Sequence, residues 1–292
     1  MATAFAPAKV NLFLHVGAPA DDGYHPLCSL MVFADIGDRV SITPAEEMDL
    51  TVVGPFARGA GPTHENLVAR AARAVIAEAG RPVPPFALML EKVLPVASGL
   101  GGGSSDAGAT LRLLHDELRL NLGDGRLEAV AARLGADGAA CLWGEPVIAE
   151  GRGERLSPAP RLPTLDAVLV YPGAPVSTPE VYRRFDALGA FGDIAVPAMP
   201  EAFENVEELA AWLATQRNDL EAASVAVAPE VGVVLDTLRD EPEVLLARVS
   251  GSGGACFALC AGHVQAESLA ERLQALAPGW WVRRCQLGAP LR

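Results

Sequence analysis

A glycine-rich stretch that ends in two serines is the part of this sequence best suited to binding phosphate. It follows an apolar segment, residues 86–90, and precedes a helical pattern. Four glycines among residues 99–103 let the backbone turn tightly and let a ligand approach closely. The free N–H groups of a first helical turn, with the positive end of the helix dipole, suit a phosphate. We therefore predict that Gly99–Ser105 binds phosphate.

Two better-known phosphate loops do not match this stretch. A Walker A loop needs a lysine and then a serine or threonine after its glycines, and no lysine follows them here. The dinucleotide fingerprint needs glycine or alanine at its last position, where the segment 99–104 ends in serine. A flexible loop is the alternative for any glycine run. The preceding strand, the two serines and the long following helix favour phosphate binding.

Lys9 and Asn11 share one face of a predicted strand over residues 8–16. The even-numbered positions of this segment are apolar, so they form the buried face. The lysine and the asparagine point to the opposite face. A solvated lysine is the alternative to a functional one.

Tyr24 and His25 lie in a segment, residues 21–26, whose composition is typical of a turn. A turn does not need an aromatic residue followed by histidine, so a ligand contact from this loop is one interpretation. The alternative is a loop that packs Tyr24 into a small core of its own.

Asp137 follows a predicted helix over residues 124–134 that Gly135 ends. An aspartate after a helix end is usually a turn former, which is the alternative to a catalytic carboxylate here. Thr178 and Tyr182 open another predicted helix. Helix capping is the alternative for the threonine, and core packing is the alternative for the tyrosine.

The remaining pattern alternates strands and helices. Strands are predicted at 31–42, 48–53, 167–171 and 281–287, and helices at 65–79, 107–118, 229–239 and 264–276. Asn66 is interpreted as an N-terminal turn residue, and Asn218–Glu221 as a capping box. Residues 186–204 have little pattern and are predicted to form a loop. The glycines and prolines of 151–163 predict a domain boundary.

Composition narrows the class of protein. The chain has 292 residues, of which 50% are hydrophobic, and a formal net charge of −13. This charge argues against a nucleic-acid partner and against an anionic membrane surface. The five cysteines are scattered and form no Cys-x-x-Cys pair, which favours reduced thiols in the cytoplasm. No basic leader and no apolar run of about 18 residues is present, so we expect a cytoplasmic protein.

Three segments together resemble the GHMP kinases, the superfamily of galactokinase, homoserine kinase and mevalonate kinase. They are Pro7–Asn11, the glycine loop, and a second glycine loop at 249–259 that leads into a strand. The triple glycine and the Asp22–His25 motif resemble one branch, the 4-diphosphocytidyl-2-C-methyl-D-erythritol kinases. A plain hairpin turn is the alternative for the second glycine loop. The chain departs from the family at Gly138–Ala139, where the family has Val-Pro.

The resemblance implies an α/β (α+β) fold of two domains. Residues 1–160 would form the N-terminal ATP-binding domain, and residues 161–292 a ferredoxin-like C-terminal domain. Lys9 and Asp137 would be catalytic, and Asn11, Tyr24, His25, Thr178 and Tyr182 would bind the substrate. ATP would lie on the loop formed by Pro95, Val96, Ala97, Ser98, Gly99, Leu100, Gly101, Gly102, Gly103, Ser104 and Ser105.

The implied reaction is transfer of the ATP γ-phosphoryl group to the 2-hydroxyl of 4-diphosphocytidyl-2-C-methyl-D-erythritol, a step of non-mevalonate isoprenoid biosynthesis. Mg²⁺ would accompany ATP, with ligands mostly from phosphates, water and a loop serine. Two alternatives remain open. One is another GHMP small-molecule kinase, and the other is a nucleotide-binding protein that has lost catalysis. The sequence does not distinguish a monomer from a homodimer.

Overall fold

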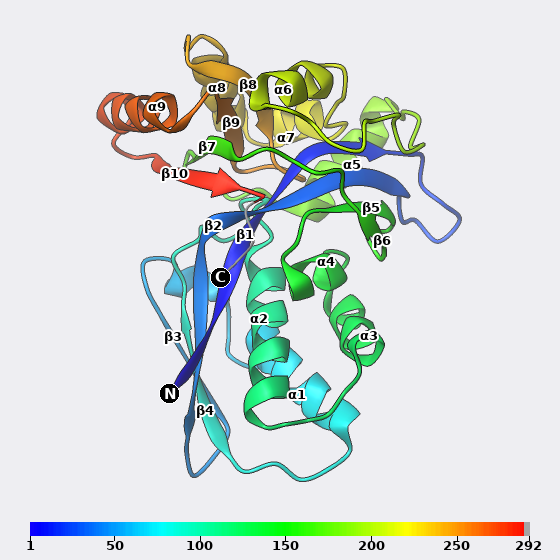
Figure 1. The fold of residues 1–292 in the computed structure, drawn as a ribbon, viewed down its shortest axis with the longest axis vertical. Coiled ribbons are helices and arrows are strands. Elements are labelled where there is room, and N and C mark those ends of the chain that lie inside the picture. The colour runs from blue at the N-terminus through cyan, green and yellow to red at the C-terminus, as the bar shows by residue number, and fades with distance from the viewer. Residues whose placement is uncertain (289–292) are drawn as a thin grey trace. The chain divides into compact units, whose positions relative to one another are not determined.

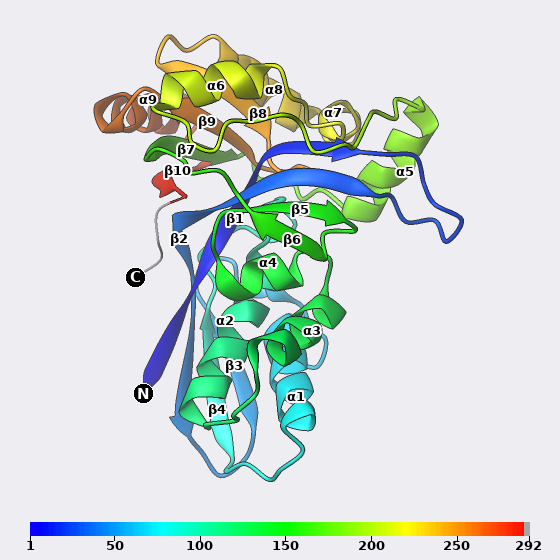
Figure 2. The same ribbon diagram turned by 45° about the vertical axis from the view of Figure 1, so that its right-hand side comes forward.

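The computed structural model describes residues 1–288, which divide into two compact units (Figures 1 and 2). The first unit consists of Met1–Lys9, Ile36–Val96 and Gly101–Gly144. The second consists of Val10–Asp35, Ala97–Leu100 and the described residues from Glu145 onward. Two long strands, β1 (Ala2–Val16) and β2 (Leu27–Pro44), contribute residues to both units. No helix among the described residues is long and apolar enough to cross a membrane.

The sheet of the first unit has the order β3-β4-β2, with β1 also paired to β2. Strand β3 (Asp49–Val53) runs parallel to β4 (Phe86–Glu91), and β4 is antiparallel to β2. Alternate residues of β4 are buried, whereas Met89 on the other face is exposed. This period of two shows that the core covers one face of the sheet.

Helices cover the buried face of this sheet (Figure 1). They pack on one another through apolar residues such as Val75, Leu111 and Leu127. Helix α1 begins after Asn66, whose side chain accepts a hydrogen bond from Val68 N, and it ends at Gly80 in the left-handed conformation. The turn interpretation of Asn66 is therefore confirmed. The elements are η1 (Ala57–Ala60), α1 (Leu67–Ala79), α2 (Gly102–Glu117), α3 (Asp124–Leu134) and α4 (Gly138–Trp143).

The second unit contains a four-stranded antiparallel sheet in the order β10-β7-β9-β8. In chain order these strands are fourth, first, third and second, and helices follow the first and the third. This is the ferredoxin-like β-α-β-β-α-β arrangement, so the predicted fold class is confirmed. The strands are β7 (Leu165–Tyr171), β8 (Val244–Val249), β9 (Cys256–Cys260) and β10 (Trp281–Leu287).

Helices α8 and α9 pack on this sheet, and all its strands contribute apolar side chains to one core. Strand β10 also pairs with β2 through Leu287 and Ala34, and β2 pairs with the hairpin of β5 and β6. The remaining elements are β5 (Val147–Gly151), β6 (Arg155–Pro158), α5 (Thr178–Leu188), α6 (Val206–Ala214), α7 (Glu221–Val227), α8 (Pro229–Arg239) and α9 (His263–Leu276).

The glycines at 151 and 153 form the turn of the β5–β6 hairpin, because β5 and β6 are antiparallel neighbours. One prediction about local structure is wrong. Asn218 does not cap a helix, since α7 begins only at Glu221. Its amide group instead donates hydrogen bonds to Val249 O and Gly251 O, both at 2.9 Å, beside the second glycine loop.

Candidate active site

Lys9 and Asp137 form an ion pair in the first unit. Lys9 Nζ lies 3.0 Å from Asp137 Oδ2, the lysine side chain is 5% exposed, and the aspartate side chain is 29% exposed. The solvated alternative for Lys9 is therefore wrong. Asp137 is a turn residue, as the alternative predicted, because Gly138 N donates to Gly135 O at 2.9 Å. It also occupies the position before α4, but its side chain makes no capping hydrogen bond. A fixed ammonium group beside a partly exposed carboxylate can orient a proton acceptor and offset negative charge.

The aliphatic part of Lys9 lies against the glycine loop. A Cβ atom at Gly101 would lie 2.9 Å from Lys9 Cβ and 3.0 Å from Lys9 Cε. Gly101 also has a φ of 63°, in the left-handed region that side chains disfavour. Glycine is therefore needed at this position both for its backbone conformation and for the approach of the lysine.

Helix α2 begins at Gly102, several residues before the apolar stripe that predicted it. The first intrahelical hydrogen bond runs from Ser105 N to Gly101 O at 2.9 Å. The N–H groups of Gly102, Gly103 and Ser104 consequently have no partner within the helix. Ser104 and Ser105 lie inside the first turn and do not cap it, because Gly101 is the capping residue. These N–H groups fit the phosphates of a nucleotide.

The second glycine loop packs against the middle of the first one, within the second unit. Ser250 Oγ donates to Gly99 O at 3.1 Å, and Ala255 N donates to Ser98 O at 2.7 Å. The same loop joins β8 to β9, which are antiparallel neighbours, so it is also a hairpin connection. Both interpretations of this motif are therefore confirmed. Asn11 N donates to Ser250 Oγ at 3.3 Å, and the Asn11 amide group donates to Ser29 Oγ at 2.7 Å.

His25 is buried beside α5 in the second unit. Its Nδ1 lies 2.8 Å from Gly17 O, and its Nε2 lies 3.1 Å from Asp186 Oδ1. A carbonyl oxygen only accepts, so Nδ1 is the donor to Gly17. The rings of His25 and Tyr182 are 5.1 Å apart. Tyr182 is half-buried at the edge of the core, so the structure brings these two predicted residues together.

Tyr24 is 61% exposed, so the alternative of a small core around it is wrong. The Arg152 guanidinium lies over its ring, 4.4 Å from the centroid, and also pairs with Asp22. Thr178 Oγ1 lies 2.7 Å from Ser252 Oγ, which connects α5 to the second glycine loop. Ser177 occupies the N-cap position of α5 without a side-chain hydrogen bond, so capping does not explain Thr178.

The departure from the family after Asp137 has a packing reason. Gly138 is the first residue of α4, and a Cβ atom there would lie 2.0 Å from Ala131 O in α3. Gly108 in α2 is similar, since its Cβ would lie 2.4 Å from Cys141 O. Close approach of α2, α3 and α4 therefore depends on these glycines.

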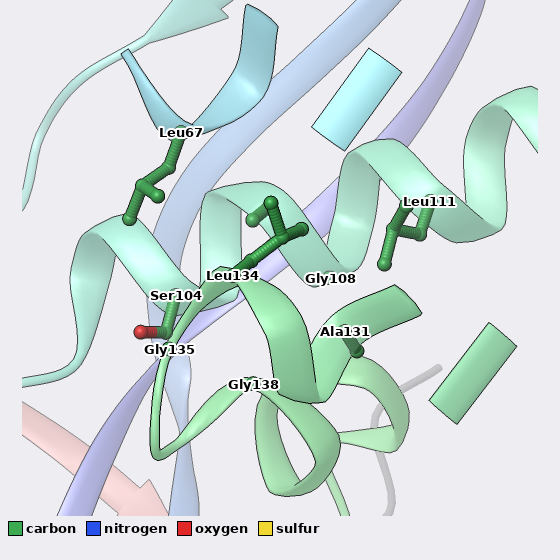
Figure 3. Close-up of a pocket in the computed structure, with 9 residues that line it drawn as sticks. Leu67, Ser104, Gly108, Leu111, Ala131, Leu134, Gly135 and Gly138 are labelled. Carbon is green, nitrogen blue, oxygen red and sulfur yellow. The ribbon is translucent and has the colours of Figure 1, made fainter. Parts of the chain in front are cut away.

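A narrow pocket lies between these helices (Figure 3). Its walls are mostly apolar or glycine, and Ser104 contributes a hydroxyl group. It therefore lies beside the first turn of α2 and next to Gly138, the residue that follows Asp137. Its lining residues are Leu67, Ser104, Ala107, Gly108, Leu111, Ala131, Leu134, Gly135 and Gly138.

The first unit contains a buried cluster of charged side chains that has no signal in the sequence. Lys92, which follows β4, contacts the carboxylates of Asp38 in β2 and Asp106 in α2. The cluster joins residues that are far apart in the sequence, and no spacing signals it. Among residues 1–288, no group of three or more His, Cys, Asp or Glu residues could hold a metal ion.

Comparison with known proteins identifies the class of the chain. The family model for the GHMP kinases N terminal domain matches residues 66–145, and the model for the GHMP kinases C terminal matches residues 195–279. These matches and the fold define a GHMP kinase, a small-molecule kinase that uses ATP. The chain is 61% identical to the 4-diphosphocytidyl-2-C-methyl-D-erythritol kinase of Caulobacter vibrioides, over 98% of this chain and 99% of the relative. It belongs to the family of 4-diphosphocytidyl-2-C-methyl-D-erythritol kinases.

Other relatives agree with this assignment. The enzyme of the same description from Hyphomonas neptunium is 46% identical, over 98% of this chain and 96% of the relative. A crystal structure of 4-(cytidine 5'-diphospho)-2C-methyl-D-erythritol kinase is 35% identical and aligns with a TM-score of 0.78, over 99% of this chain and 100% of that one. A crystal structure of L. major mevalonate kinase has a TM-score of 0.69 at 16% identity, over 100% of this chain and 97% of that one, and shows the fold alone. The predicted family is therefore confirmed.

Proposed function

We propose that this chain transfers the γ-phosphoryl group of ATP to the 2-hydroxyl of 4-diphosphocytidyl-2-C-methyl-D-erythritol, giving the 2-phosphate. The product would serve isoprenoid precursor biosynthesis by the non-mevalonate pathway. The observation that carries the proposal is the ion pair of Lys9 and Asp137 beside Gly101, in a chain that is 61% identical to a kinase of this description.

Asp137 is the group proposed to accept or orient the proton of the acceptor hydroxyl. Its carboxylate is partly exposed, so a substrate can reach it, and Lys9 holds it from the buried side. Lys9 also offsets the negative charge that develops on the transferred group. Phosphoryl transfer depends on positioning and charge neutralisation more than on covalent chemistry, and this pair supplies both.

The loop Pro95–Ser105 is proposed to bind the phosphates of ATP. The N–H groups at the start of α2 have no partner within the helix, and the helix dipole favours anions there. Mg²⁺ is proposed to accompany ATP, and when bound it would neutralise phosphate charge. No metal-binding cluster supports a protein cage for it among residues 1–288, so phosphates, water and a loop serine are its proposed ligands.

The acceptor is proposed to contact residues of the second unit. Tyr24, His25 and Tyr182 supply aromatic surface and hydrogen-bonding groups that suit a cytosine ring. Asn11 and Thr178 are held by Ser29 and Ser252, and they are proposed to position the rest of the acceptor.

The domain division at residue 160 and the cytoplasmic location also remain proposals. The two family-model matches, 66–145 and 195–279, lie on either side of residue 160, which supports a sequential division. The compact units interleave along the chain, so limited proteolysis that maps the protected fragments would test it. Five buried free cysteines are consistent with a reducing compartment, and cell fractionation would test the location.

The first experiment measures ADP release by purified protein with ATP, Mg²⁺ and the cytidine-bearing acceptor, for the wild type and for Asp137→Asn. We expect acceptor-dependent turnover that falls by about 10² or more in the variant, the size typical of an acid–base group. Turnover that survives the change would leave the kinase assignment and remove the proposed base. If the protein binds ATP but shows no turnover with this acceptor, the proposed substrate is wrong. Homoserine and mevalonate would then be tested as acceptors.

A further inference from the structure

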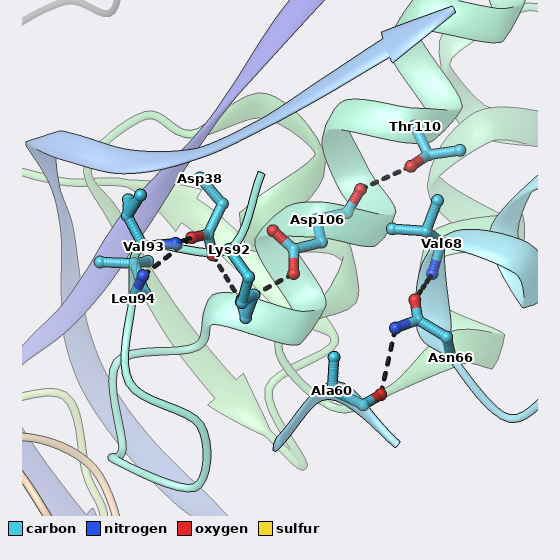
Figure 4. A network of polar contacts seen from close by, with 9 residues as sticks. All are labelled: Asp38, Ala60, Asn66, Val68, Lys92, Val93, Leu94, Asp106 and Thr110. Carbon is cyan, nitrogen blue, oxygen red and sulfur yellow. Dashed lines mark hydrogen bonds and ion pairs between the residues drawn. The ribbon is translucent and has the colours of Figure 1, made fainter. Parts of the chain in front are cut away.

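Asp38, Lys92 and Asp106 form a buried cluster (Figure 4). In the sequence Lys92 precedes the phosphate loop and Asp106 follows it. Lys92 Nζ donates hydrogen bonds to Asp38 Oδ2 at 2.5 Å and to Asp106 Oδ2 at 2.8 Å. All three side chains are less than 5% exposed. Figure 4 shows the lysine between the two carboxylates, which come from β2 and α2.

Asp38 holds the backbone that leads into the loop. Its Oδ1 accepts hydrogen bonds from Val93 N at 2.6 Å and from Leu94 N at 2.8 Å. These residues come immediately before Pro95, the first residue of the loop. One carboxylate therefore fixes both the Lys92 ammonium group and the backbone that follows it.

Asp106 holds the other end of the loop. It lies in α2 immediately after Ser105, and its side chain is the second acceptor of Lys92. Lys92 also lies under the first residue of that helix, because a Cβ atom at Gly102 would be 2.9 Å from Nζ. The lysine therefore connects the chain before the loop to the helix turn whose N–H groups are proposed to bind phosphate.

The charges of the cluster do not balance. Two carboxylates share one ammonium group, and Oδ1 of Asp106 is buried without a hydrogen-bond partner among residues 1–288. Burial and the neighbouring Asp38 raise the pKa of Asp106 to about 7, although Lys92 acts against them. Burial alone would lower the pKa of Lys92, but the two carboxylates more than offset it and raise that pKa. Buried ion pairs of this kind contribute little net stability compared with apolar residues.

We propose that Lys92 and Asp106 are positioning residues of the ATP loop, and that the acceptor oxygen of Asp106 fixes the first turn of α2 through Lys92. The inference rests on the ATP-binding part of the proposed function. It adds that this cluster fixes the N–H groups of Gly102–Ser104 in position for phosphate. The entropy cost of ordering them then arises when the protein folds and not when ATP binds.

The test compares Asp106→Leu with Asp106→Asn. Leucine removes the acceptor and leaves Lys92 paired with Asp38 alone, so the variant should fold with an unchanged or higher Tm. Its Kd for ATP in the presence of Mg²⁺ should rise about tenfold, because the loop loses a charged hydrogen bond. Calorimetry without the phosphoryl-accepting substrate measures this Kd. Asparagine keeps an acceptor oxygen and should restore the affinity. The substrate that accepts the phosphoryl group is absent from this measurement. An error in its proposed identity would therefore not affect the result.

Thr110→Val is the matched control, since it removes a neighbouring buried hydrogen bond from Thr110 Oγ1 to Asp106 O at 2.7 Å without touching the carboxylate. It should leave the Kd for ATP unchanged. If Asp106→Leu does not fold, Asp106→Ala replaces it, because alanine favours the helix and also lacks the acceptor. Wild-type affinity in a folded variant that lacks the acceptor would overturn the inference, as would an equal loss of affinity in the asparagine variant.

Discussion

The ammonium group of Lys9 lies 3.0 Å from the carboxylate of Asp137, and the stem of the same lysine lies against Gly101. One side chain therefore connects the proposed base to the proposed ATP loop within a single compact unit. The lysine is buried whereas the carboxylate is partly exposed. The buried lysine therefore fixes the carboxylate, and the exposed part of the carboxylate remains accessible to a substrate.

Lys9 and Asp137 should act as a unit in catalysis. We expect Lys9→Met to lower kcat by about 10² or more, and the double variant with Asp137→Asn to be no slower than the slower single variant. Steady-state kinetics of the four proteins measures this. Asp124→Asn is the control, because that carboxylate is exposed at the start of α3 and should leave kcat unchanged. Additive losses would show that the two groups act independently.

Tyr182 should affect the acceptor and not ATP. Removing its ring with Tyr182→Leu should raise the KM for the acceptor about tenfold, since stacking of a base on an aromatic ring contributes about 1–3 kcal/mol. Tyr182→Phe keeps the ring that faces His25 and should stay close to the wild type. Kinetics with each substrate varied in turn checks this. A rise in the KM for ATP instead would place Tyr182 at the nucleotide.

Restoring the family's residue at position 138 should destabilise this chain. In Gly138→Val the new side chain would meet Ala131 O, 2.0 Å from its Cβ, so α3 and α4 would have to separate. We expect a loss of about 1–3 kcal/mol or more in the free energy of unfolding, measured with urea.

Gly125→Ala is the matched control for that substitution. Gly125 lies in α3, and no atom would lie within 4 Å of a Cβ there. Alanine should raise the free energy of unfolding by about 0.5–1 kcal/mol, because it favours a helix over glycine. A stable Gly138→Val protein would mean that the close packing of α3 and α4 is not needed.

His15 should make the protein sensitive to acid. Both ring nitrogens are buried without a hydrogen-bond partner among residues 1–288. Burial, and then Arg217, lowers the pKa of His15 from 6.5 to about 4. The folded state therefore favours the neutral ring. The free energy of unfolding is therefore not lowered by protonation of His15 above pH 6.5. It decreases as the pH falls toward 4, by an amount on the order of 3 kcal/mol.

Replacing His15 with leucine should flatten this pH dependence. Urea unfolding at intervals between pH 7 and pH 4 would compare the two proteins, because leucine has no proton to bind. An identical acid slope in both proteins would assign the loss of stability to other groups.

The five cysteines should not react with a thiol reagent until the protein unfolds. All are buried, and burial raises the pKa of Cys28 to about 11 and that of Cys141 to about 12. Only the thiolate is a good nucleophile, so native protein should react slowly. Titration with a chromogenic disulfide, with and without denaturant, measures this. Rapid reaction of the native protein would show that a described cysteine becomes accessible.

Local signals predicted the elements that present the candidate site. Alternation marked β1 around Lys9, the apolar stripe marked α2, and the glycines with two serines marked the loop between β4 and α2. These signals work because each depends on residues that are close in the sequence. The roles of Lys9 and Asp137 came from family resemblance, since spacing alone left each with an ordinary alternative.

Contacts between distant segments could not be predicted in this way. Helix α4 has only six residues, too few to show a helical period, and it was missed although Asp137 precedes it. The β5–β6 hairpin around the glycines at 151 and 153 could not be predicted, because nothing local shows that β5 pairs with β2. The cluster of Asp38, Lys92 and Asp106 depends on tertiary folding for the same reason.

The pairing of β10 with β2 has a consequence for synthesis of the chain. Leu287 pairs with Ala34, so β2 completes its sheet only with residues that are made much later. At about 5–20 residues per second, the interval is on the order of 10–50 s. During that time the apolar residues of Val10–Val16 and Leu30–Phe33, which are buried in the finished protein, have no complete core. The nascent chain should therefore depend on chaperones that shield apolar segments near the ribosome.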